Sequence, residues 1–124
     1  MAAVDYGRYT LHSIAATTNA SGDVTAYSDT IVTGEVMYVA YVKNNYDNGV
    51  DFTITGETTT LSLWTDTDVN ASEVVRPLVA GNLNTDGSAL TAYASPMLLA
   101  ERIKIVVAQG GNAKSGTFRI LVRR

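Results

Sequence analysis

The sequence contains no cysteine, and this absence excludes several kinds of chemistry at once. Disulfide frameworks, cysteine-ligated zinc sites, iron–sulfur sites and cysteine nucleophiles all require thiol groups. Small extracellular animal domains usually carry disulfides, so the chain is not expected to be one of them. The composition fits a protein that folds in a reducing cytoplasm and meets the outside later.

Charged residues are also scarce. They make up 17% of the 124 residues, whereas about a quarter is typical of soluble domains. The formal net charge is −3, and the basic residues form no run beyond Arg123-Arg124. Nucleic-acid binding needs a concentrated basic surface, and binding to a membrane surface needs a basic amphipathic helix, so neither partner is expected. Thr, Ser, Asn and Gly must supply the polar surface, which suits β-structure and a surface covered by neighbouring molecules.

Helical periodicity is nearly absent, whereas alternation with a period of two is common and is interrupted by clusters of Gly, Asn and Asp. This pattern predicts one all-β domain over residues 1–124, either an antiparallel β-sandwich or a jelly-roll-like barrel. Residues 1–7 are expected to form a short extended N-terminal arm. The expected strands are 8–18, 24–32, 35–43, 50–55, 59–65, 72–80, 102–108 and 117–123, while 90–99 stays undecided.

Several local features refine this prediction. Residues 35–43 are apolar on both faces, which predicts a strand covered on both sides. The Asn48-Gly49 pair indicates a hairpin, and the last two strands are expected to pair as another. Pro77 makes 72–80 an edge strand or an irregular segment, and Pro96 is expected to end or kink its segment.

The alternation also assigns faces to the side chains. Tyr9, Leu11 and Ser13 should share one face, Val36 should face the same way as Tyr38, Ala40 and Val42, and Leu61 and Leu63 should lie opposite Trp64. The inward-facing residues of three further strands are expected to be Val50, Phe52 and Ile54, then Ile103, Ile105 and Val107, then Phe118, Ile120 and Val122.

No catalytic, metal or cofactor site is expected. His12 is the single histidine and stands beside Ser13, which is not a triad. Residues 66–70 carry oxygen ligands at alternate positions, as calcium-binding loops do. Ala71 and Pro77 stand where such loops have Gly and Glu, so we interpret residues 66–70 as a solvated turn. Residues 110–116 resemble a phosphate loop but lack the Gly before the Lys and lead into a strand.

The remaining polar and aromatic residues also favour structure over catalysis. Four carboxylates, Asp51, Glu57, Glu73 and Glu101, are scattered over strand edges and turns, so no pair is indicated for acid–base chemistry. Tyr38, Tyr41 and Trp64 lie in the predicted strands and are expected in the core or an interface. Tyr6, Tyr9, Tyr27, Tyr46 and Tyr93 lie nearer the arm or loops, where some could contact a partner.

The segment from Leu98 to Thr117 carries a resemblance. It contains a Glu101-Arg102 pair, a β-branched strand, the loop Gly110-Gly111-Asn112-Ala113-Lys114 and then Gly116-Thr117 before a final strand. This pattern is similar to the C-terminal segment of small proteins encoded among the head genes of tailed phages. The resemblance covers residues 73–124, and its motif is structural and carries no chemistry.

The resemblance implies a capsid decoration or cement protein. Such proteins are compact β-structures on the outer capsid surface, and often trimers, that clamp adjacent major capsid proteins. The implied partners are the phage major capsid protein and further copies of this chain, as a homotrimer or a dimer. The implied location is the capsid exterior of the virion, after assembly in the bacterial cytoplasm. The interface candidates are Val4, Tyr6, Tyr9, Arg119, Arg123 and Arg124.

Three alternatives remain open at this stage. The chain could be another phage virion component, such as a tail or head fibre. It could be a carbohydrate-binding β-sandwich module that uses loop tyrosines with Asp66 and Asp68. An enzyme ranks last, because a convergent polar pocket is not evident in the sequence.

Overall fold

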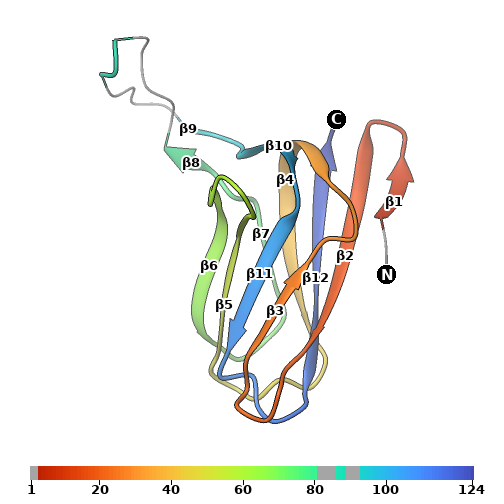
Figure 1. Ribbon diagram of the computed structural model, residues 1–124, viewed down its shortest axis with the longest axis vertical. Helices are drawn as coiled ribbons and strands as arrows, with labels where there is room; N and C mark the ends of the chain where they lie inside the picture. The colour runs from red at the N-terminus through yellow and green to blue at the C-terminus, as the bar shows by residue number, and fades with distance from the viewer. Residues whose placement is uncertain (1–2, 81–85, 89–92) are drawn as a thin grey trace.

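The computed structural model describes residues 3–80, 86–88 and 93–124, and within them it consists of antiparallel β-sheets (Figure 1). The described residues contain no helix, and so none that is long and apolar enough to cross a membrane. The prediction of an all-β antiparallel fold is confirmed. The expected loop at 81–87 and the undecided segment 90–99 lie partly outside the described residues.

Two sheets pack face to face. The six-stranded sheet has the order β1 (Ala3–Tyr6), β2 (Tyr9–Thr17), β12 (Ser115–Arg123), β4 (Val32–Lys43) and β10 (Met97–Glu101), with β7 (Glu73–Val75) also paired to β4. The four-stranded sheet has the order β3 (Val24–Tyr27), β11 (Ile103–Ala108), β5 (Val50–Gly56) and β6 (Ser62–Val69). The short pair β8 (Val79–Ala80) and β9 (Tyr93–Ala94) extends from one end of the sandwich (Figure 1).

The core lies between the sheets, and its main strands are those that the alternation predicted. The expected inward residues of β5, β11 and β12 are all buried. Tyr41, Phe52 and Phe118 form an aromatic cluster at its centre, with ring centroids 5.2 to 5.3 Å apart. Such ring pairs add to the hydrophobic stabilisation that the buried strands already provide.

The N-terminal segment is extended, but it is not a free arm. Strand β1 pairs with β2 along its whole length, through a tight turn at Gly7, whose φ of +70° suits a residue without a Cβ. The last residue of the chain fixes this turn, because the backbone N–H of Arg124 donates to the carbonyl of Arg8 at 2.8 Å. The segment is thus extended, as predicted, and residues 3–6 form an edge strand of the six-stranded sheet.

The predictions of two hairpins, one at Asn48-Gly49 and one between the last two strands, are wrong. Strand β11 belongs to the four-stranded sheet and β12 to the six-stranded sheet, so the segment between them crosses the sandwich. The loop that contains Asn48-Gly49 likewise joins β4 in one sheet to β5 in the other. Alternation identifies the buried face of a strand but not its neighbour, and these strands meet across the core rather than edge to edge.

Bulges overturn two of the face assignments. Leu121 pairs with Tyr38 and Val122 with Val36, so Met37 is an extra residue in β4 and both Val36 and Val39 face the core. A second bulge in β6 directs both Leu63 and Trp64 toward the core. Strand β6 also continues through Val69, so the expected polar turn at residues 66–70 is mostly strand.

The two prolines separate strands as predicted, whereas the strand expected at residues 24–32 is shorter than predicted. Pro77 separates β7 from β8, and Pro96 separates β9 from β10, as predicted. The expected strand at residues 24–32 is shorter, because β3 ends at Tyr27 and Val32 already belongs to β4. Tyr9, Leu11 and Ser13 do share one face, and it is the outer one, since His12, Ile14 and Ala16 are the buried residues of β2.

Candidate interaction face

An apolar row crosses the outer face of the six-stranded sheet. Directly paired residues of antiparallel strands point to the same side of a sheet. Because Phe118, Ile120 and Val122 point into the core, Leu121 points outward. The strand register then places four outward side chains side by side across β1, β2, β12 and β4: Val4, Leu11, Leu121 and Tyr38.

Two further rows flank it, and together the three rows define what we call the outer face. One consists of Tyr6, Tyr9, Arg123, Glu35 and Met97, and the other of Ser13, Arg119, Ala40 and Val74. Tyr6, Met97 and Val74 keep 60%, 53% and 68% of their surface exposed. Large apolar side chains thus remain accessible at both margins of the face.

Two arginines occupy the outer face in different electrostatic states. Arg123 forms an ion pair with Glu35, with the guanidinium nitrogen 2.6 Å from the carboxylate oxygen. Arg119 forms no ion pair or side-chain hydrogen bond with any residue that the structure describes. The positive charge of Arg119 is therefore available to a partner.

The sequence-predicted interface residues gather on this face, with one exception. Val4, Tyr6, Tyr9, Arg119 and Arg123 all belong to the outer face. Arg124 lies at its margin, where its guanidinium pairs with Asp5 and donates to the carbonyl of Gly7, so that it fastens the N-terminal hairpin.

The structure adds residues to this set that the sequence analysis missed. Leu11, Tyr38 and Leu121 form most of the apolar row, and Met97 extends the face onto β10. The alternation of β12 indicated that Leu121 points away from Phe118 and Ile120, but it could not show that Leu11 and Tyr38 lie beside it. The bulge at Met37 also reversed the orientation of Tyr38 relative to Val36.

Residues 35–43 were expected to be covered on both sides, and the described residues cover only the inner side of this strand. Tyr38 and Val42 point outward and are only half-buried. No strand among the described residues packs on this side of the sheet.

The four-stranded sheet presents a different outer surface. Its central outward row consists of Thr25, Val106, Thr53 and Thr65 across β3, β11, β5 and β6. Threonine hydroxyls remain compatible with water, and Val106 stands alone among them with 39% of its surface exposed. A second outward row on this sheet consists of Tyr27, Lys104, Thr55 and Ser62. Both sheets therefore expose aromatic and cationic side chains, but the continuous row of four apolar side chains lies on the outer face of the six-stranded sheet.

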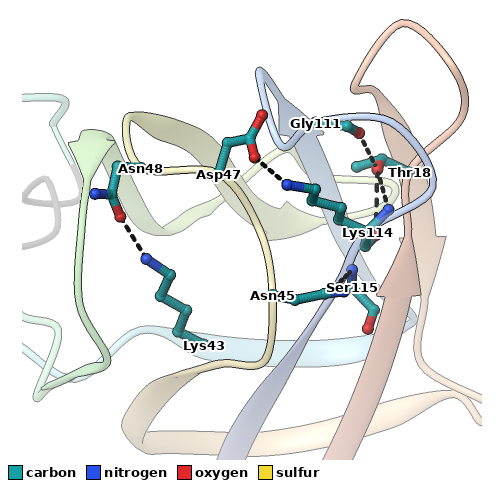
Figure 2. A network of polar contacts seen from close by, with 8 residues as sticks. All are labelled: Thr18, Lys43, Asn45, Asp47, Asn48, Gly111, Lys114 and Ser115. Carbon is teal, nitrogen blue, oxygen red and sulfur yellow. Dashed lines mark hydrogen bonds and ion pairs between the residues drawn. The ribbon is translucent and has the colours of Figure 1, made fainter.

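The loops at one end of the sandwich form a network of polar contacts (Figure 2). The Thr18 hydroxyl donates to the carbonyl of Gly111 at 2.5 Å and accepts from the backbone N–H of Lys114 at 3.0 Å. The ammonium of Lys114 pairs with Asp47, and the ammonium of Lys43 donates to Asn48 at 2.5 Å. Both ammonium groups in Figure 2 are therefore already bonded within the chain.

This network explains the glycine-rich motif at residues 110–116 in structural terms. The N–H of Gly110 donates to the carbonyl of Gly22 at 2.9 Å, and Gly111 has a φ of +92°. A Cβ at Gly116 would lie 2.4 Å from Cε2 of Tyr46. The motif is thus a crossover between sheets that needs close backbone approach, and not the hairpin that was expected.

The candidate catalytic residues do not converge. His12 faces inward and Ser13 outward, so they lie on opposite sides of β2. The Asp51 carboxylate accepts the backbone N–H of Asp68 at 2.8 Å, and Glu57 pairs with Arg102. Over residues 3–80, 86–88 and 93–124, no three His, Asp or Glu side chains are close enough together to hold a metal ion.

Glu101 is a buried carboxylate that joins the two sheets. It extends from β10 and accepts hydrogen bonds from the backbone N–H groups of Thr58 and Thr59 at 2.9 and 3.0 Å, and from the Thr59 hydroxyl at 2.8 Å. Burial by itself raises the pKa of Glu101, but the hydrogen bonds from Thr59 and Thr58 outweigh it and hold the pKa below its ordinary value. The carboxylate thereby fastens the β5–β6 turn to the six-stranded sheet.

The residues named for a carbohydrate site are dispersed. Tyr46 is 2% exposed, and its hydroxyl donates to the carbonyl of Ala16 at 2.5 Å, so it belongs to the core. Burial raises the pKa of both Tyr41 and Tyr46 to about 12. Asp66 and Asp68 lie on β6, at the edge of the other sheet from the exposed Tyr6 and Tyr9.

Comparison with known proteins gives one structural neighbour. No family model matches the sequence, and no curated protein matches it. The crystal structure of FLHE is similar over 95% of this chain and 100% of that one, with a TM-score of 0.45 and 13% sequence identity. A similarity at this level supports no inference about function.

Proposed function

We propose that this chain is a structural virion protein that decorates a phage head. It binds the outer surface of the assembled capsid through its outer face and stabilises the contacts between major capsid proteins. The proposal combines the resemblance of residues 73–124 to small phage head proteins with the composition of the outer face. The role is one of binding and involves no catalytic step.

The observation that supports this role best is the asymmetry of the two sheets. Interfaces are enriched in aromatic residues, Met and Arg in their cores. The outer face presents Tyr6, Tyr9, Met97 and an Arg119 that has no ion pair among the described residues, and its central row is apolar across four strands. The central outward row of the opposite sheet has three threonines beside Val106, and Tyr27 and Lys104 lie in the next row. A partner with an apolar patch and an acidic group opposite Arg119 would complement this face.

Stabilisation of the shell would follow from mass action. A ligand that binds only the assembled state lowers the free energy of that state at every site it occupies. A homotrimer would present three outer faces at once, so that one trimer would hold several capsid subunits and gain avidity.

The location of the chain tests the proposal first. Mass spectrometry of purified virions should find it in many copies, and electron cryo-microscopy should place it on the capsid exterior with the outer face toward the shell. A few copies at the tail would instead support the fibre alternative. Complete absence from virions would refute both virion roles.

A pair of matched variants tests the face itself. Leu121→Glu places a charge in the apolar row, and Val106→Glu places the same charge at an outward strand position on the opposite sheet. We expect Leu121→Glu to weaken binding to heads that lack the protein by at least about tenfold, because it buries an unpaired charge at the interface. Val106→Glu should bind as the wild type does. Equal affinities for both variants would refute the assignment of the face.

A further inference from the structure

A small cleft opens beside the N-terminal hairpin. The turn of this hairpin and the C-terminus lie at the same end of the sandwich (Figure 1). Its volume is about 280 Å³, and it lies between β1, β2 and the segment that enters β4. Such a volume holds several water molecules or one small organic group. Its polar lining consists of Asp5, Thr10, His12, Thr30, Thr33 and Arg124.

His12 contributes the most unusual group to this lining. The residue is 6% exposed, yet its imidazole makes no hydrogen bond or ion pair with any described residue. Among the described residues, the one fully buried side-chain polar atom without a partner is the Tyr41 hydroxyl oxygen, so the ring nitrogens of His12 keep some accessible surface. A neutral imidazole carries one donor and one acceptor. The ring nitrogens are therefore available to a group that enters the cleft.

The hydrogen-bond donors that remain free around the cleft favour an anionic group. The Asp5 carboxylate is already engaged, since Arg124 lies 2.5 Å from it and the Thr10 hydroxyl donates to it at 3.3 Å. A cation would have to displace Arg124 from this pair. A carboxylate could instead accept from the remaining N–H groups of Arg124 and from His12.

We propose that this cleft binds a carboxylate between His12 and Arg124, with one proton taken up from solvent by the imidazole. The carboxylate is that of a small free anion or that of an acidic side chain on a partner protein. The cleft does not include Leu121 or Arg119, so this inference is independent of the proposed role of the outer face.

The charges near His12 are consistent with proton uptake by the imidazole when a carboxylate binds. Burial lowers the pKa of His12, so the imidazole is neutral at pH 7 in the free protein. Among the described residues, the other titratable groups that line the cleft are Asp5 and Arg124, which neutralise each other. A bound carboxylate would favour the imidazolium, and binding should therefore strengthen as the pH falls from 7 to 5.

Because the chain has a single histidine, NMR of the imidazole reports on this site alone. The probes are acetate and the peptide N-acetyl-Gly-Glu-Gly-amide, with sodium chloride at equal ionic strength as the control. We expect a saturating carboxylate to raise the titration midpoint of the His12 ring by at least about one pH unit. Tighter binding of acetate would indicate a free anion, and tighter binding of the peptide would indicate an acidic side chain. No shift with either probe at about 100 mM would overturn the proposal.

Variants separate specific binding from general charge effects. Arg124→Gln should weaken acetate binding by about tenfold, whereas Arg76→Gln, which removes an exposed arginine outside the cleft, should leave it unchanged. Asp5→Asn removes a negative charge from the lining and should tighten binding, a gain that a misfolded variant could not show. Equal effects of Arg124→Gln and Arg76→Gln, or weaker binding by Asp5→Asn, would overturn the assignment.

Discussion

Replacement of Gly116 by alanine tests whether the glycine-rich motif is a packing requirement. Gly116 lies on β12 directly under the ring of Tyr46, and an added Cβ would be 2.4 Å from Cε2 and 2.8 Å from Cδ2. The ring cannot retreat freely, because its hydroxyl donates to the carbonyl of Ala16 at 2.5 Å and its face stacks on Tyr41 with centroids 6.2 Å apart. The methyl group must therefore displace a buried side chain or shift β12.

The expected cost follows from these contacts. Overpacking a well-packed core destabilises a protein by about 1–3 kcal/mol, and removal of a glycine from a strand returns up to about 1 kcal/mol. We expect Gly116→Ala to lower the free energy of unfolding by about 2 kcal/mol. For a domain of this size that corresponds to a decrease in Tm of roughly 6–12 °C and a urea midpoint lower by about 1 M.

Urea unfolding followed by the fluorescence of the single tryptophan, Trp64, measures this cost. A double-mutant cycle with Tyr46→Leu identifies its origin, because a smaller and more flexible side chain should accommodate the methyl group. The cost of Gly116→Ala should then fall by at least about 1 kcal/mol in the Tyr46→Leu background. A wild-type midpoint for Gly116→Ala, or the same cost in both backgrounds, would refute the packing explanation.

The shifted pKa values of two carboxylates, Glu101 and Glu73, predict how the stability of their variants depends on pH. Glu101→Gln should destabilise the protein by about 2 kcal/mol at pH 7, since it removes the charge from three buried hydrogen bonds. Because the pKa of Glu101 is lowered on folding, this difference should disappear as the pH falls through that pKa, and a difference independent of pH in urea titrations would contradict it. Glu73 is exposed, but partial desolvation and the neighbouring Asp66 raise its pKa, so its ionisation disfavours the folded state as the pH rises through that pKa. Glu73→Gln should therefore have a slightly higher Tm than the wild type at pH 7 and an equal Tm near pH 4, whereas an unchanged Tm at both would show that Asp66 does not disfavour the ionised Glu73.

The sequence analysis placed the interface candidates by composition and position, and the structure supplied their arrangement. Tyr9 and Arg123 stand 114 positions apart in the chain, yet β2 and β12 make them direct neighbours. The cleft around His12 could not be anticipated, because its walls come from β1, the start of β4 and the last residue of the chain. Contacts between segments so distant in sequence leave no local periodicity to detect.

The sequence by itself determined that the chain forms strands and which residues of the strongest strands face the core. Period-two alternation at Val50 to Ile54, Ile103 to Val107 and Phe118 to Val122 is a local property, because successive side chains of a strand point to opposite sides whatever the neighbours are. Tertiary structure alone decided which strands pair and where bulges fall. β11 and β12 lie in different sheets although they follow each other in the chain. Met37 is displaced because β4 pairs with β12 on both sides of it in a register that shifts by one residue there, and that register depends on both strands together.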